Sequence, residues 1–277
     1  MTVVLGLLAA VLYGVGDFAG GIGSRRISAV TLLLWSYPLG AALMTALLFA
    51  FPGHLTWHVA LFGVLGGMSG LLGVVVMYHL MTVAPINVIS PVTAVLAAIV
   101  PVIVGVGIGE RPAVAAWIGI VIGLAAVVLV SRSADDHPLG RVTPRVLALA
   151  LLAGLGFGLY FVFLARAGGG AGLWPLTISR IASALAVVPI ARARGAVAAV
   201  RGRTLGIVAL AGTCDALANM FFLLATHAGL LSLASVLTSL YPATTVLLAV
   251  TLLHERLTWT QRGGLALAAA AIVLITV

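Results

Sequence analysis

Three ionisable side chains lie inside long apolar segments of this sequence: Asp17, Arg180 and Asp215. A charged group is costly inside a lipid bilayer, so an ionisable residue at that depth is a candidate for function. Burial disfavours the charged form of a carboxyl group, which lets such a group take up and release protons. We therefore predict that Asp17, Arg180 and Asp215 bind a small solute or a proton.

The residues around Asp215 offer two interpretations. Asn219 follows Asp215 by four residues, so the two share one helix face. A carboxylate with an amide one turn away can bind a cation, an ammonium group or a proton. Alternatively, Asp215 pairs with Arg180 and only holds the helices together, because a buried ion pair is weak evidence for function.

Aromatic and hydroxyl side chains could complete such a site. Tyr13 stands one helical turn before Asp17, and a tyrosine can both stack on a solute and hydrogen-bond to it. The other candidates for the same cavity are Trp35, Tyr160, Ser235, Thr238 and Tyr241. The alternative for each aromatic residue is packing or anchoring at the membrane interface.

The sequence lacks the residue patterns for disulfide bonds, metal sites and hydrolytic catalysis. Cys214 is the single cysteine, so no internal disulfide can form, and no metal-type Cys/His spacing occurs. His54 and His58 are four residues apart, but no glutamate follows His54, so the zinc-hydrolase pattern fails and we expect surface histidines. We predict no enzyme activity, no metal and no cofactor.

Composition indicates a membrane protein. The 277 residues are 63% hydrophobic and 7% charged, whereas soluble domains have about 25% charged residues. The net charge of +8 comes entirely from arginines, which lie singly and in pairs at the ends of apolar segments. A nucleic-acid-binding protein would instead carry a basic face on a soluble domain, so we expect no nucleic-acid partner.

Apolar runs of about 20 residues, the length needed to cross a bilayer, predict ten membrane-spanning helices and an all-α fold. The predicted spans are 3–22, 28–51, 59–81, 86–108, 113–131, 146–166, 173–192, 204–226, 230–252 and 259–277. Prolines predict kinks in the fourth and ninth of these spans. They are Pro85, Pro91, Pro101 and Pro242.

The chain contains an internal duplication. Residues 84–132 align without a gap on residues 229–277, and Glu110 then aligns with Glu255. Five spans precede the most polar segment, Ser131–Arg145, and five follow it. Because five is odd, the second half enters the membrane from the opposite side, and the two halves are inverted repeats. We predict repeats at 1–132 and 146–277, joined by a linker at 133–145. Asp17, Arg180 and Asp215 have no charged counterparts in the other half.

Arginines also predict orientation. Eleven of the 14 lie in or beside the odd-numbered connections, and two lie in the even-numbered ones. Positive charge favours the cytoplasmic side, so this bias places the odd connections in the cytoplasm. Both chain ends then lie outside, on the same side of the membrane.

Two segments resemble the EamA repeats of the drug/metabolite transporter superfamily. They end in Gly109-Glu110-Arg111-Pro112 and His254-Glu255-Arg256-Leu257, and the stretch 232–242 is also similar. The resemblance implies a ten-helix basket with a central cavity, which moves small solutes by alternating access. Many members keep both termini in the cytoplasm, which is opposite to the arginine bias here. Asp17 and Arg25 also resemble the acid and downstream base in the first helix of small multidrug-resistance proteins.

These observations predict a secondary active transporter in the inner cell membrane. We expect it to export small polar, zwitterionic or cationic metabolites, amino-acid-like or drug-like, by transport coupled to protons. An uptake transporter of the same fold is the near alternative, and an intramembrane enzyme or a non-transporting membrane subunit is the alternative from another class. The expected partners are the solute, protons and the bilayer, and we expect a monomer, with a dimer as the alternative.

Overall fold

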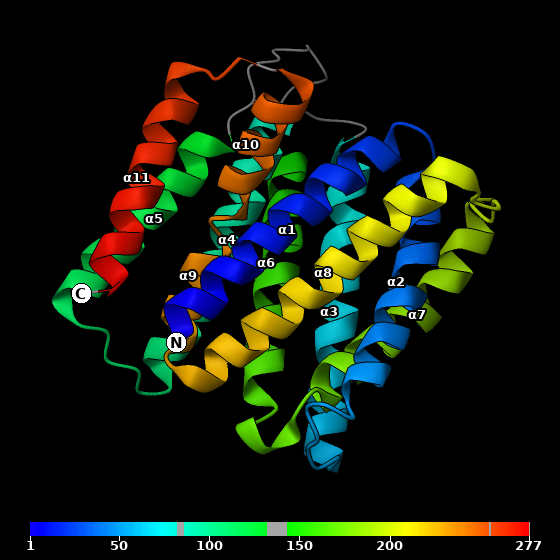
Figure 1. Cartoon of the computed structure of the whole chain (residues 1–277), viewed down its shortest axis with the longest axis horizontal. Helices are drawn as coiled ribbons and strands as arrows, with labels where there is room; N and C mark the ends of the chain where they lie inside the picture. The colour runs from blue at the N-terminus through cyan, green and yellow to red at the C-terminus, as the bar shows by residue number, and fades with distance from the viewer. Residues whose placement is uncertain (82–85, 132–142, 255, 277) are drawn as a thin grey trace.

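The structure is a computed structural model that describes residues 1–81, 86–131, 143–254 and 256–276 (Figure 1). These residues form eleven α-helices and one short 3-10 helix, η1 (Gly169–Ala171), with no strand among them. The α-helices are α1 (Thr2–Ser24), α2 (Ala29–Leu47), α3 (Trp57–Met81), α4 (Ile86–Gly107), α5 (Val114–Val130), α6 (Pro144–Arg166), α7 (Trp174–Ala193), α8 (Gly202–Ala228), α9 (Leu231–Thr238), α10 (Tyr241–Leu253) and α11 (Trp259–Thr276).

Each predicted span contains helix, and nine of the ten contain one continuous helix. The ninth is broken: α9 ends at Thr238, α10 begins at Tyr241, and Pro242 occupies the first turn of α10. The prediction of a kink at Pro242 is thus confirmed as a break. Pro91 and Pro101 lie inside α4, which is assigned as one helix, and Pro85 lies outside the described residues.

Nine segments of the described chain are long and apolar enough to cross a membrane, with α9 and α10 counted together as one. The remaining helix, α5, is apolar but has 17 residues. A long apolar helix satisfies its backbone hydrogen-bonding groups by bonds within the helix, which a segment in hydrocarbon requires. The fold is therefore that of an all-helical, multi-pass membrane protein.

The helices pack in pairs drawn from the two halves of the chain. Helix α1 packs along α8, and α3 packs along α6. Helix α4 contacts α6 and α9, while α1 contacts α9 and α10. The remaining pairs are α2 with α7 and α5 with α11, and Figure 1 shows the second of these at the left of the bundle.

Glycines allow several of these pairs to approach closely. A Cβ atom added at Gly154 or Gly158 of α6 would lie 2.6 Å from the Cβ of Leu96 or Val100 of α4. Such an approach excludes any larger residue, and close contact drives helix association in lipid. Gly20 of α1 is different, because an added Cβ would have nothing within 4 Å. That part of α1 faces open space.

At one end of the bundle the connections are tightly interlocked. The Trp174 indole donates to the Gly53 carbonyl at 3.2 Å, and the His54 amide donates to the Gly170 carbonyl at 3.0 Å. In a separate contact, the Glu110 carboxylate accepts hydrogen bonds from the amides of Leu231 at 2.5 Å and Ser232 at 3.0 Å.

Glu110 satisfies the free amides that begin α9, which is a structural role. His54 and His58 are exposed, as predicted for surface histidines. Glu255, which aligns with Glu110 in the second half of the chain, lies outside the described residues.

Candidate functional site

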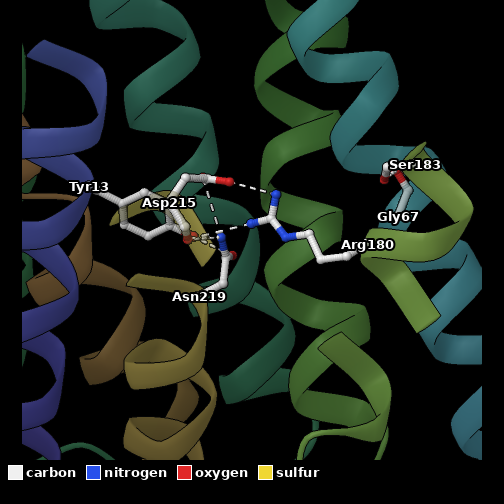
Figure 2. Close-up of polar contacts among 6 residues, drawn as sticks. All are labelled: Tyr13, Gly67, Arg180, Ser183, Asp215 and Asn219. Carbon is white, nitrogen blue, oxygen red and sulfur yellow. Dashed lines mark hydrogen bonds and ion pairs between the residues drawn. The ribbon is translucent and has the colours of Figure 1, made fainter. Parts of the chain in front are cut away.

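An ion pair joins α7 to α8 inside the membrane-length helices. Nη1 of Arg180 lies 2.5 Å from Oδ2 of Asp215, and Nη2 donates to the Asp215 backbone carbonyl at 3.5 Å (Figure 2). The arginine is buried, with 6% of its surface exposed, whereas the Asp215 side chain is 38% exposed. The Asp215–Arg180 pair, which was the alternative interpretation of Asp215, is thus present, and one of its two partners remains accessible.

Two further residues extend the pair to α1. The Asn219 amide nitrogen donates to the Asp215 carbonyl at 2.7 Å and to its Oδ1 at 3.4 Å. The Tyr13 hydroxyl of α1 donates to the Asn219 side-chain oxygen, as Figure 2 shows. Tyr13, Asn219, Asp215 and Arg180 therefore form one hydrogen-bonded series across α1, α8 and α7, which we term the polar network.

Helix geometry explains part of the polar network. Residues four apart lie one above the other, so Asn219 can bond both the backbone and the side chain of Asp215. Tyr13 reaches the network because α1 approaches α8 at Gly16. A Cβ at Gly16 would lie 3.4 Å from the Asp215 amide nitrogen. A glycine at this crossing therefore positions the tyrosine that bonds Asn219.

Arg180 has a second set of neighbours on α2, α6 and α7. Its guanidinium carbon lies 5.6 Å from the centre of the Tyr37 ring, a cation–π distance. Tyr160 lies beside Ser179 and Arg180. Nevertheless, the Tyr160 hydroxyl, the Ser179 hydroxyl and Arg180 Nε are buried without a hydrogen bond of good geometry among the described residues. These three groups could hydrogen-bond a water molecule or a polar solute.

The position of α7 itself is held by another side chain. Ser183, one turn after Ser179, donates from its hydroxyl to the Gly67 carbonyl of α3 at 2.9 Å (Figure 2). A Cβ at Gly67 would lie 2.4 Å from the Ser179 carbonyl, so the two helices are in direct backbone contact there. This contact fixes the helix that presents Arg180.

Asp17 lies near the polar network but outside it. Its surface is exposed, and no ion pair to Asp17 occurs among the described residues. It is close enough to Asp215, Tyr78 and Tyr241 to interact with them electrostatically. The rings of Tyr13 and Tyr241 lie 6.0 Å apart, which brings Tyr241 to the same region. Asp17 is thus an accessible carboxylate beside three tyrosines.

Two different faces of α1 are exposed. In its first half the exposed residues are Val4, Leu8 and Val11, an apolar set suited to lipid. In its second half they include Asp17 and Gly21, and at 100° per residue these lie on another face. A Cβ at Gly21 would have nothing within 4 Å. The second half of α1 therefore opens to the space beside Asp17, toward the α1–α2 connection.

Three predicted site residues lie elsewhere. Trp35 is 41% exposed and donates from its indole nitrogen to the Ala198 carbonyl in the α7–α8 connection, 3.0 Å away. Ser235 and Thr238 are fully buried on α9, and their hydroxyls have no hydrogen-bond partner among the described residues. Within the described residues, no hydrogen bond, ion pair or ring contact joins any of the three to the polar network.

Sequence spacing does not identify three residues near the polar network. Tyr37, Tyr78 and Ser179 lie on α2, α3 and α7, and only helix packing brings them near Arg180, Asp17 or Tyr160. In the described part of the chain, no group of three His, Cys, Asp or Glu side chains is placed to hold a metal ion.

The fold and the buried charges define the class: this is a multi-pass membrane protein with a polar site inside its helical bundle. Residues 1–132 and 144–277 match the EamA-like transporter family, so the chain belongs to that family, as the Glu-Arg segment ends predicted. A solved crystal structure of another protein, 19% identical in sequence, has the same fold with a TM-score of 0.82. The similarity covers 99% of this chain and 96% of the other. A search of curated protein sequences gives no match.

Proposed function

We propose that this protein is a secondary active transporter that exports small polar, zwitterionic or cationic metabolites by alternating access, coupled to protons. Its family consists of transporters, which supports the general activity. One observation carries the specific proposal: Asp17 is exposed, has no ion pair within the described residues, and lies beside a network that contains a buried charge pair. An ionisable residue inside the membrane carries a large free-energy cost, and such residues commonly mark a solute or ion pathway.

We assign separate roles to the residues of the site. Asp17 takes the positively charged part of the solute, or a proton when the solute has left. Asp215 and Asn219 contact the solute from α8. Arg180 stays paired with Asp215 and sets how strongly the Asp215 carboxylate binds the solute. Hydroxyl and aromatic groups bind the remainder of the solute. They are Tyr13, Tyr160 and Tyr241, which lie in or beside the polar network.

We infer a scaffold of ten membrane crossings in two inverted repeats, 1–132 and 146–277, joined by 133–145. The packing supports it: if α1 corresponds to α6 and α3 to α8, the α1–α8 contact is the counterpart of the α6–α3 contact. The contacts of α4 with α6 and of α9 and α10 with α1 correspond in the same way. On this scheme the two termini lie on one side of an inner cell membrane.

The open face of α1 supports access from one side at a time. Asp17, Gly20 and Gly21 face open space near the α1–α2 connection, whereas the α2–α3 and α6–α7 connections interlock at the other end. The arginine bias favours a cytoplasmic position for the α1–α2 connection. A site open to the cytoplasm can load a cytoplasmic solute, which favours export over uptake.

Flux into and out of liposomes tests the proposal. Purified protein is reconstituted, and zwitterionic, cationic and anionic solutes are screened with and without a pH gradient. We expect protein-dependent flux of a zwitterion or cation that changes with the gradient and is lost in the D17N variant. Flux that the gradient drives only inward would indicate uptake. An enzyme or a non-transporting subunit would move no solute at all, which would overturn the proposal.

A further inference from the structure

Six exposed arginines gather at the end of the bundle where α1 and α8 meet α2 and α7. We term this set the arginine surface; it comprises Arg25, Arg26, Arg192, Arg194, Arg201 and Arg203. They lie in or beside two connections distant in sequence, α1–α2 and α7–α8, which lie together at the upper right of Figure 1. The surface is separate from the proposed solute site and does not depend on the transport activity.

Specific contacts hold these two connections together. The Thr31 hydroxyl at the start of α2 donates to the Ala196 carbonyl at 2.8 Å, and Trp35 bonds Ala198 in the same connection. Ile27, Leu32, Val200 and Val208 form a small apolar cluster beneath them. The arginines are therefore displayed on an ordered surface built from both halves of the chain.

No carboxylate balances this positive charge in the described part of the chain. The described acidic residues are Asp17, Glu110 and Asp215, and the last two are engaged in the α9 cap and the Arg180 pair. Asp17 lies two turns before Arg25 on α1. Arginine is the side chain best suited to bidentate binding of phosphate, and basic clusters at a membrane surface attract anionic headgroups.

Exposed apolar residues lie among the arginines. Val197 is 62% exposed and stands between the Arg192–Arg194 and Arg201–Arg203 pairs, and Trp35 is exposed beside it. A tryptophan whose indole nitrogen is bonded and whose ring is exposed is typical of the headgroup level of a bilayer. A soluble phosphate would use the arginines only, whereas a lipid would use both kinds of residue.

We propose that the arginine surface binds the phosphate headgroup of an anionic phospholipid, with Val197 and Trp35 against the upper part of its acyl chains. The lipid bridges the α1–α2 and α7–α8 connections. Because long-range attraction between exposed charges is screened by salt, binding weakens as ionic strength rises.

The test is native mass spectrometry of the full chain in neutral detergent, titrated with phosphatidylglycerol or with phosphatidylcholine. We expect phosphatidylglycerol to bind at least about tenfold more tightly at low salt, with each lost arginine weakening it about fivefold. The R25Q/R26Q variant should then bind it about 25-fold more weakly, and R201Q/R203Q should behave similarly. The matched control is R111Q/R166Q, which removes two exposed arginines from other connections and should change binding less than twofold.

Three results would overturn the proposal. Equal affinity for the two lipids would show that charge does not select the ligand. An equal loss in R111Q/R166Q and in both test variants would show a diffuse charge effect. Displacement of phosphatidylglycerol by an equal concentration of glycerol phosphate would show a site for a soluble phosphate.

Discussion

Replacing Asp215 should destabilise the protein more than replacing its partner Arg180, because the two are unequally exposed. The D215N variant leaves a guanidinium that is 6% exposed without its carboxylate. Removing one partner of a buried pair costs about 3–5 kcal/mol, and the Tyr37 ring and the residue-215 carbonyl remain to reduce this to about 3 kcal/mol. The R180Q variant leaves a carboxylate that is 38% exposed and can hydrate, so about 1 kcal/mol is expected.

Thermal unfolding of the purified full chain in detergent measures this difference. In a chain of this size, 1 kcal/mol corresponds to roughly 2–4 °C in Tm. We expect D215N to lower Tm by roughly 6–12 °C and R180Q by roughly 2–4 °C. The double variant D215N/R180Q should resemble R180Q, because it contains no unpaired buried charge.

Two results would refute this reasoning about the ion pair. Equal losses in the two single variants would mean that exposure does not govern the cost. A double variant whose loss equals the sum of the single losses would mean that the two side chains are not energetically coupled.

Three other variants test the contacts around the site. In a C214A background, which removes the single cysteine, G21C should react rapidly with a water-soluble thiol reagent, because that position faces open space; slow labelling would contradict an open face. Y13F removes the hydroxyl that bonds Asn219 and should lower stability by about 1 kcal/mol, measured by denaturant unfolding, and an unchanged midpoint would argue against this bond. E110Q keeps a weaker cap on α9 and should cost about 1 kcal/mol, whereas a variant as stable as the parent would show that the cap contributes nothing.

Sequence patterns predicted the helices well because each span is a long apolar run. They indicated that Asp215 and Asn219 share one helix face, because four-residue spacing is local geometry. They offered the Arg180–Asp215 pair as an alternative, since few charges were present to pair. In each of these cases the prediction rests on neighbouring residues in the sequence or on the small number of charged residues inside the spans.

Contacts between helices could not be predicted in the same way. The Tyr13–Asn219 bond joins residues 206 positions apart, and it depends on how closely α1 approaches α8 at Gly16. Tyr37 reaches Arg180 only because α2 packs on α7. Pro242 indicated a disturbance in the ninth span, but proline chemistry alone does not specify that two residues leave the helix there. Tertiary packing decides all three.

The most direct test of the proposed solute site compares D17N with the parent protein in liposome flux under an imposed pH gradient. Asp17 is exposed and has no ion-pair partner among the described residues, so D17N should keep the parent's thermal stability. A loss of flux can then be assigned to the site and not to unfolding. We predict that D17N, with an unchanged Tm, loses gradient-driven flux. Gradient-driven flux in D17N equal to that of the parent protein would contradict the account.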